Sequence, residues 1–257
     1  MQNALLVGLS RQMSLSHQID IIANNIANID TTGFKADTAA FSEYLGSGAS
    51  DGDFGGKDRR ISFVQDHGTW IDFSPGAMQR TGDPLDAAID GKGYFVVQTP
   101  RGQRYTRNGA FGLNATGQLV TSTGDLVLGT TGPINFQPTD HDIIISTTGV
   151  SARDGSGTLS VQRGQLQLVD FDNAQQLQKD GASTFQAAPN ANQKPIAPGT
   201  RIVQGSIEKS NVRPILQMTR MIEITRSYSD IAVILQQQGD LRRNSLQQLS
   251  QAAGTSG

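Results

Sequence analysis

Residues 23–35 of the chain read Ala-Asn-Asn-Ile-Ala-Asn-Ile-Asp-Thr-Thr-Gly-Phe-Lys. Asparagine inside a helix lowers helix propensity, because its amide competes for backbone hydrogen bonds. Asn24 and Asn28 lie four residues apart and therefore share a helix face, where they can hydrogen-bond to a partner. Gly33 is placed to stop the helix, and Phe34 to anchor the chain beyond it. An amide face beside a stripe of isoleucines predicts a specific protein–protein interface.

The residues that precede this stretch predict one long helix from Ala4 to about Ile29. This segment has no proline, and a second, offset stripe of Leu6, Leu9 and Met13 lies on the same helix. The main apolar stripe advances in steps of four, three, four and three residues, which is helical spacing. Its members are Leu15, Ile19, Ile22, Ile26 and Ile29.

A second long helix is predicted at the C-terminal end. Pro214 suits a first helical turn, and Ser210 or Asn211 is placed to cap it. The apolar positions advance in steps of three and four; they are Met218, Met221, Thr225, Tyr228, Ala232 and Leu235. At 1.5 Å per residue the two helices would be about 40 Å and about 50 Å long. Two such helices at opposite ends of one chain favour pairing with each other over separate docking.

The middle of the chain has the pattern of an all-β domain. Short β-branched and aromatic runs, such as Gly93–Thr99, alternate with glycine-containing turns every eight to twelve residues, which is typical of a sandwich or barrel. Further strands are expected at Gln103–Arg107, Ala110–Leu113, Gln118–Thr121, Leu126–Leu128, Asp142–Ser146, Leu159–Val161, Leu166–Phe171 and, as one strand, Arg201–Glu208. The predicted fold class is therefore α+β, with paired terminal helices in a coiled-coil-like layer and a central antiparallel β domain.

This pattern divides the chain into four predicted segments. Residues 1–34 form the N-terminal helix and residues 35–75 an irregular connector, in which the Gly- and Asp-rich stretch 46–58 is expected to be a flexible loop. Residues 76–208 form the central β domain, and residues 209–257 form the C-terminal helix.

Composition excludes several classes of function. The chain has 257 residues, a formal charge of −2 and no cysteine, which argues against nucleic-acid binding and removes thiol chemistry and cysteine-based metal sites. No apolar run approaches the roughly 20 residues of a membrane-spanning helix. The first residues lack the basic and long apolar parts of a secretory signal, so we expect no cleaved signal peptide. Only 17% of the residues are charged, below the roughly 25% of typical domains, which indicates a surface that contacts protein.

Sites of chemistry are scarce in the sequence. The three histidines are far apart, and the stretch that begins Asp51-Gly52-Asp53 lacks the later ligands of a calcium loop. Asp83, Asp86 and Asp90 could form an acid–base pair for glycosidic chemistry, but they also suit turns beside glycine and proline. We therefore predict no enzyme, no cofactor and no metal site, with a secreted β-rich carbohydrate-active protein as an alternative.

Three ordered motifs resemble those of a known family. Residues 23–35 resemble the N-terminal signature of the flagellar axial proteins, the rod and hook family. The stretch 210–214, followed by Met218, Met221-Ile222, Arg226 and Tyr228, resembles the C-terminal signature. Between them, residues 84–95 and the run Tyr-Thr-Arg-Asn-Gly at 105–109 resemble the β domain of the rod members.

The resemblance implies a structural subunit of the bacterial flagellar basal body. Such a subunit would polymerise helically into a periplasmic rod that transmits torque and encloses the export channel, after passing through the flagellar export apparatus. Its partners would be copies of itself and other rod proteins. The chain looks most like the proximal-rod members, and a distal-rod member is the alternative. The expected assembly interface comprises Leu15, Ile19, Ile22, Asn24, Asn25, Ile26, Asn28, Thr31, Gly33, Phe34, Asn211, Met218, Met221, Ile222, Thr225, Tyr228 and Leu235.

Overall fold

The computed structural model describes residues 2–47, 60–155 and 160–254 of the chain. They belong to two compact units. Unit 1 contains residues 1–26, 37–70 and 213–257, and unit 2 contains residues 27–36 and 71–212. The chain therefore passes between the units at four peptide bonds, 26–27, 36–37, 70–71 and 212–213.

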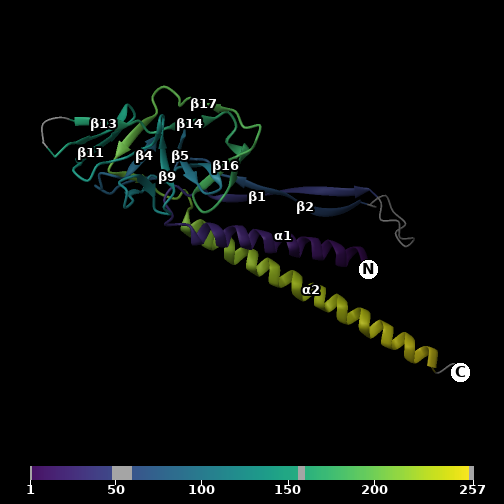
Figure 1. The fold of residues 1–257 in the computed structure, drawn as a ribbon. Helices are drawn as coiled ribbons and strands as arrows, with labels where there is room; N and C mark the ends of the chain where they lie inside the picture. Colours follow the sequence, from purple (N-terminus) through teal and green to yellow (C-terminus); the bar gives the residue numbers. More distant parts are fainter. Residues whose placement is uncertain (1, 48–59, 156–159, 255–257) are drawn as a thin grey trace. The chain divides into compact units, whose positions relative to one another are not determined.

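Unit 1 consists of both terminal helices and a two-stranded ribbon (Figure 1). The helices are α1 (Gln2–Ala27) and α2 (Pro214–Gly254), and the ribbon is β1 (Asp37–Ser47) with β2 (Arg60–Ile71). Pro214 begins α2, as its fixed φ favours. The predicted combination of terminal helices with a β-rich centre is confirmed.

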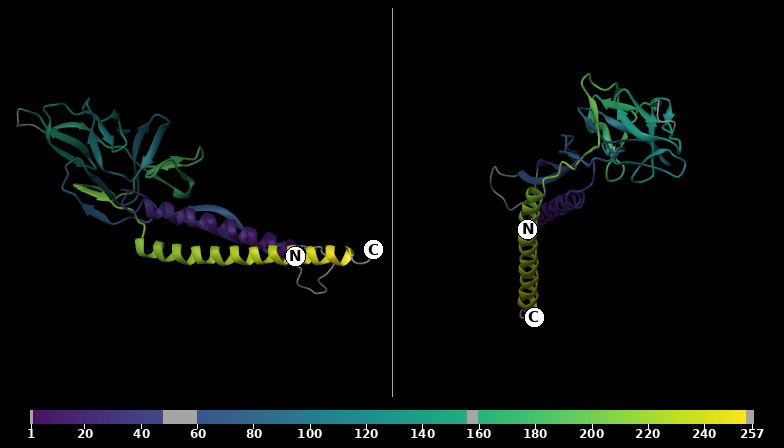
Figure 2. Two further views of the ribbon diagram at one scale, coloured as in Figure 1. Left: turned by 90° about the horizontal axis from the view of Figure 1, so that it is seen from below. Right: turned by 90° about the vertical axis from the view of Figure 1, so that its left-hand side faces the viewer.

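The two helices run in opposite directions within unit 1. A Cβ at Gly8 would lie 2.6 Å from Leu235 Cδ2. Gln18 and Ile22 line a groove whose residues on α2 are Gln217, Arg220, Glu223 and Ile224. Early α1 is thus near late α2, and late α1 is near early α2. Figure 2 shows in two views that α2 extends past the N-terminal end of α1.

The stretch 35–75 is not an irregular connector, because most of it forms β1 and β2. The sequence of β2 has β-branched and aromatic residues at many positions, which favours an extended chain. The neighbouring glycines and aspartates favour a loop, and they obscure the strand pattern of β2 in the sequence. The predicted flexible loop at 46–58 lies mostly outside the described residues, and its first two residues end β1.

Unit 2 contains one large sheet and three small ones. The order of the main path of the large sheet is β15-β16-β6-β5-β9-β8-β7. Beside this path, β14 pairs with β5, β17 pairs with β14, and β10 pairs with β9. Its strands are β5 (Tyr94–Thr99), β6 (Gly102–Thr106), β7 (Phe111–Leu113), β8 (Leu119–Thr121), β9 (Leu126–Gly129), β10 (Gly132–Pro133), β14 (Leu168–Phe171), β15 (Leu177–Lys179), β16 (Thr184–Ala187) and β17 (Gln193–Lys194), and the 3-10 helix η1 (Ala174–Gln176) precedes β15.

The small sheets are all antiparallel. β11 (His141–Ser146), β12 (Gly149–Arg153) and β13 (Ser160–Gly164) form a three-stranded sheet. β18 (Arg201–Gln204) pairs with β4 (Ala87–Asp90), and β19 (Ser206–Glu208) pairs with β3 (Met78–Arg80). The single strand that we predicted from Arg201 to Glu208 is wrong, because Gly205 has a φ of +68° and divides it into β18 and β19.

The centre of the large sheet is buried on both faces. Along β5, Phe95 and Val97 belong to one apolar cluster and Tyr94 and Val96 to another, as expected when successive side chains point to opposite faces. All four side chains are at most 4% exposed. This explains why the sequence of β5 is continuously apolar instead of alternating.

We expect Phe95→Ala to lower the free energy of unfolding by about 3–5 kcal/mol, because it opens a cavity in a closed core. Phe95 is fully buried, and its ring lies 5.0 Å from that of Phe111. Chemical denaturation followed by circular dichroism would measure the change. Leu113→Ala is the control, since Leu113 is 42% exposed and its truncation should cost less than about 1 kcal/mol. Equal losses in the two variants would contradict this core assignment.

Candidate assembly interface

The asparagines of residues 23–35 do not share one role. Asn25 is 1% exposed, and its side-chain amide makes two hydrogen bonds to the backbone of Asp37. Its Nδ2 donates to the Asp37 carbonyl oxygen at 2.7 Å, and its Oδ1 accepts from the Asp37 N–H at 2.9 Å. It therefore ties the end of α1 to the start of β1 within unit 1. Asn24 is exposed, and Asn28 is half-buried and accepts a hydrogen bond from the Thr31 hydroxyl. The amide of Asn25 is thus used within the chain, and Asn24 is the asparagine on the outer surface.

Gly33 is required by a close approach of two backbones in unit 2. Its φ is +70°, and its N–H donates to the Glu208 carbonyl at 2.7 Å. A Cβ here would lie 2.4 Å from the Asn108 nitrogen, so no other residue fits without displacement. Phe34 is 1% exposed, and the Lys179 ammonium lies 4.0 Å from the centre of its ring. Gly33 and Phe34, both predicted interface residues, therefore have roles inside unit 2.

A buried charge cluster follows directly on this segment. Lys35 Nζ lies 2.6 Å from Glu208 Oε1, and both side chains are 2% exposed. Glu208 Oε2 lies 3.2 Å from Arg107 Nη1, so one carboxylate serves two cations. The Gly76 N–H also donates to Glu208 Oε1, at 2.9 Å. Burial lowers the pKa of Lys35, and the Glu208 carboxylate opposes that shift.

Backbone carbonyls supply further acceptors for the two cations. Lys35 Nζ donates to Ser74 O at 2.8 Å, and Arg107 donates to the carbonyls of Ile89 and Gly91. The Arg107 guanidinium also lies 5.4 Å from the Tyr94 ring centre. The two cations are therefore stabilised by one shared carboxylate and by the dipoles of several backbone carbonyls, which offset the cost of burying charge.

Asn211 joins the same segments through its amide. Its Oδ1 accepts from the Ala36 N–H at 2.8 Å, and its Nδ2 donates to the carbonyls of Asp72 and Ser74. Residues 33–36, 72–76 and 208–211 are thus held together, and each lies next to a bond at which the chain passes to unit 1. We call these three segments, with Arg107, the junction. Asn211 was predicted to contact a neighbour, but its amide is committed to the junction.

The sequence alone did not identify Lys35, Arg107 and Glu208 as functional residues. Lys35 and Arg107 are part of the quoted motifs, but Lys35 and Glu208 are 173 positions apart and no local pattern pairs them. The three aspartates considered for acid–base chemistry have structural partners. Asp83 accepts from the Leu85 N–H, Asp86 from the Thr81 hydroxyl, and Asp90 pairs with Arg201.

The apolar stripes of the helices separate into covered and exposed faces. On α1, Leu15 and Ile22 are buried, and Ile19 and Ile26 are half-buried. On α2, Met221, Tyr228 and Leu235 are half-buried, whereas Met218, Ile222 and Thr225 are exposed. The one stripe that we predicted for α2 is therefore divided between two faces. Further exposed apolar residues, which our predicted interface omitted, include Leu6, Leu9, Met13, Ile215 and Val233.

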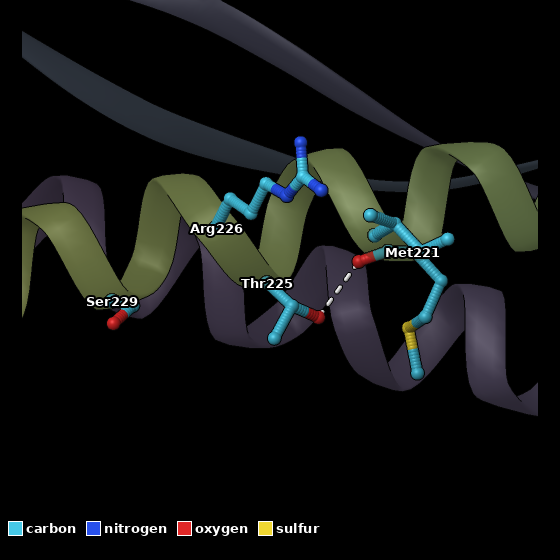
Figure 3. Close-up of a pocket in the computed structure, with 5 residues that line it drawn as sticks. Met221, Thr225, Arg226 and Ser229 are labelled. Carbon is cyan, nitrogen blue, oxygen red and sulfur yellow. Dashed lines mark hydrogen bonds between the residues drawn. The ribbon is translucent and has the colours of Figure 1, made fainter.

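A hollow lies on the exposed face of α2 (Figure 3). It is lined by Met221, Ile222, Thr225, Arg226 and Ser229. The Thr225 hydroxyl donates to the Met221 carbonyl at 2.7 Å, so this short side chain lies back against its own helix. Small residues at 225 and 229, beside the larger Ile222 and the Arg226 stem, leave space for a side chain from elsewhere.

The described parts of the chain offer neither a metal-binding cluster nor a membrane-spanning helix. No group of three or more histidine, aspartate or glutamate side chains there is placed to hold a metal ion. Among the same residues, no helix is both long and apolar enough to cross a membrane.

Comparison with known proteins gives three family matches in the same order as the motifs. Residues 5–35 match "Flagella basal body rod protein", residues 88–152 match "Flagellar hook protein FlgE/F/G D1 domain", and residues 203–249 match "Flagellar basal body rod FlgEFG protein C-terminal". The first and last matches contain most of α1 and of α2. The central match lies within unit 2.

Curated relatives extend over nearly the whole chain. The flagellar basal-body rod protein FlgF of Caulobacter vibrioides is 37% identical, over 97% of this chain and 98% of the relative. FlgF of Mesorhizobium japonicum is 32% identical over 92% of this chain, and FlgG of Bacillus subtilis is 35% identical over 91%. The chain is thus a structural protein of the flagellar axis. It belongs to the flagellar basal-body rod protein family.

We expect Glu208→Gln to lower the free energy of unfolding by about 3–5 kcal/mol, because Lys35 and Arg107 would lose their buried counter-charge. Urea denaturation of the purified chain would measure this. Glu223→Gln is the matched control, since Glu223 is exposed on α2 and its change should cost no more than about 0.5 kcal/mol. An E208Q variant as stable as the control would mean that the cluster is not a structural constraint.

Gly33 and Gly82 differ in how close another backbone lies, although both have a left-handed backbone conformation. Gly33 and Gly82 both have positive φ, at +70° and +81°, but a Cβ at Gly82 would meet nothing within 4 Å. Gly82→Ala should therefore cost only the left-handed backbone penalty of about 1–2 kcal/mol. Gly33→Ala should cost clearly more, because its Cβ collides with the Asn108 backbone. Equal losses in thermal or urea unfolding would show that the contact is easily relieved.

Proposed function

We propose that this chain polymerises helically through its terminal helices and builds the proximal part of the flagellar rod. The observation that carries the proposal is the exposure of large apolar side chains on both helices. Met13 is 67% exposed and Ile215 83% exposed, and Leu6, Met218 and Ile222 are each more than half exposed. Ile215, Met218 and Ile222 share one face of α2 by their spacing, and an exposed apolar stripe of this kind marks a contact site for another protein.

The exposed stripes favour an open polymer. The stripe on α1 and the stripe on α2 are different surfaces, so a contact between them is heterologous, and repeated heterologous contacts generate rings or helical filaments. A rod requires a helical filament. In this proposal, residues 1–34 and 209–257 form a coiled-coil-like inner layer around the export channel. Residues 35–75 connect this layer to a β domain at 76–208, arranged as a sandwich or barrel outside it.

The family membership supports the remaining parts of the proposal. The chain would leave the cell body through the flagellar export apparatus without a cleaved signal and would act in the periplasm. There it would contact copies of itself and neighbouring rod proteins and transmit torque without catalysing a reaction. The relatives named FlgF favour the proximal rod, and the relatives named FlgG keep a distal-rod position as the alternative. Locating a tagged chain in isolated basal bodies by electron microscopy would separate the two.

We expect Ile222→Asp to reduce incorporation into basal bodies by about tenfold or more, because it would bury an unpaired charge between subunits. Incorporation can be measured by immunoblotting of purified basal bodies, and function by motility in soft agar. Gln237→Asp is the control, since Gln237 is a polar, exposed residue of the same helix and its change replaces no apolar side chain. Normal incorporation of I222D would contradict the proposed interface.

A further inference from the structure

The hollow on α2 has the geometry of a coiled-coil hole. Four of its lining residues, Ile222, Thr225, Arg226 and Ser229, stand at positions i, i+3, i+4 and i+7 of one helix. This is the diamond of four side chains that receives a knob from a facing helix. Figure 3 shows the small Thr225 and Ser229 side chains and the Arg226 stem on this part of α2.

A second diamond directly precedes the first. Ile215, Met218, Thr219 and Ile222 have the same i, i+3, i+4, i+7 spacing, and all four are exposed. Ile222 is a corner of both diamonds, so their centres are seven residues apart. A partner helix that fills both must therefore present two apolar side chains seven residues apart on one face.

The N-terminal helix of the same chain carries such a pair. Leu6 and Met13 are seven residues apart and are 54% and 67% exposed, with Leu9 between them at 50%. Seven residues make almost two full turns, so both side chains leave α1 on the same side. Leu15 and Ile22, which are also seven residues apart, occupy the covered side of α1.

Resting on the proposed function, we propose that α1 of a second copy of this chain lies antiparallel on the exposed face of α2, with Leu6 in the 222–229 hole and Met13 in the 215–222 hole. This alignment also places Leu9 beside Ile222. The chain's own α1 is excluded, because its Gly8 approaches Leu235, which faces away from this stripe of α2. The occupant must therefore be another molecule.

The alignment fixes a stagger between neighbours. Within one chain, residue 8 of α1 is level with residue 235 of α2. In the proposed contact, residue 6 is level with the centre of the 222–229 hole. The two alignments differ by about 12 residues, so the neighbour is displaced by about 17 Å along the helices. A displaced heterologous contact cannot close on itself as a two-fold dimer. The 215–222 and 222–229 holes on α2 of the second copy remain open for a third copy.

Charge does not oppose this contact. The charged residues within the two contacting segments, residues 6–13 and 215–229, are Arg11, Arg220, Glu223 and Arg226. Arg11 and Arg220 each lie two residues from a stripe member, about 200° round the helix, and so point away from the partner. Glu223, like Arg220, lines the groove beside the chain's own α1. Arg226 lines the hole with its aliphatic stem, and its charged end can remain at the rim in water.

Crosslinking of cysteine pairs tests the register without background, because the chain has no cysteine of its own. Two differently tagged full-length chains would be expressed together in motile cells, one carrying Leu6→Cys and the other Thr225→Cys, or one Met13→Cys and the other Met218→Cys. Isolated basal bodies would then be treated with a short bifunctional thiol reagent. We expect a covalent dimer that carries both tags from each of these pairs.

The same four substitutions in exchanged combinations are the control. Leu6→Cys with Met218→Cys, and Met13→Cys with Thr225→Cys, should give no doubly tagged dimer. Dimers from the exchanged pairs alone would overturn the antiparallel register. Products that join this chain only to another rod protein would overturn the second-copy assignment. Basal bodies that contain both tagged chains but give no dimer would overturn the inference and leave the proposed function intact, whereas absence of the tagged chain with its natural sequence from basal bodies would overturn the proposed function itself.

A charge-exchange experiment covers the case in which cysteine variants are not incorporated. Met13→Glu and Met218→Lys should each reduce incorporation, and the two together should restore it, because the new charges would face each other between copies. Met13→Glu with Thr225→Lys carries the same charges in the wrong register and should not restore it. Failure of the first pair to restore incorporation, or equal restoration by both pairs, would refute the register.

Discussion

The pairing of Glu208 with Lys35 and Arg107 is the interaction on which the placement of the other segments depends. Its three members come from widely separated parts of the chain and meet where water is nearly excluded. A buried charge left without its partner costs several kcal/mol, so the chain near residues 35, 107 and 208 cannot separate without a large loss of stability. Segments 33–36, 72–76 and 208–211 lead into β1, out of β2 and into α2. The junction therefore holds together, within unit 2, the three segments that lead to unit 1.

Glycine makes this close association of backbones possible. A Cβ at Gly76 would lie 1.9 Å from the Lys209 carbonyl oxygen, and one at Gly109 would lie 1.6 Å from the Ala87 carbonyl oxygen. Both contacts are shorter than any real packing distance, so a side chain there would push the segments apart. The glycine after residues 23–32 looks in the sequence like a helix stop. In the fold α1 has already ended at Ala27, and Gly33 serves the contact with Asn108.

The sequence predicted those features that have a local period and missed those that depend on contacts between distant residues. Steps of three and four residues located α1 and α2, and the apolar run at 94–97 located the central strand β5. The spacing of apolar residues could not show which face of α2 the rest of unit 1 covers. Met218 and Met221 were therefore predicted to lie on one stripe, whereas Met218 is exposed and Met221 is half-buried. Asn25 and Asn211 looked suitable for an interface because amides are specific, but the same property lets them bind their own backbone. Nothing local in β19 indicates that Glu208 pairs with a lysine near the N-terminus.

The two units differ in the source of their stability. Unit 2 contains two closed apolar clusters, so its strands are stabilised by contacts inside the same chain. On α2, Gln217 is the one side chain less than a tenth exposed among those the structure describes, and large apolar residues lie on more than one side of the helix. A helix that is apolar on several sides is typical of a position where it is surrounded by protein. Because isolated amphipathic helices gain most of their stability from packing, in the proposed polymer α2 would depend on neighbouring subunits for its stability more than β5 does. Polymerisation would then complete the folding of unit 1, and the unusually low charge of the chain becomes a requirement of that last step.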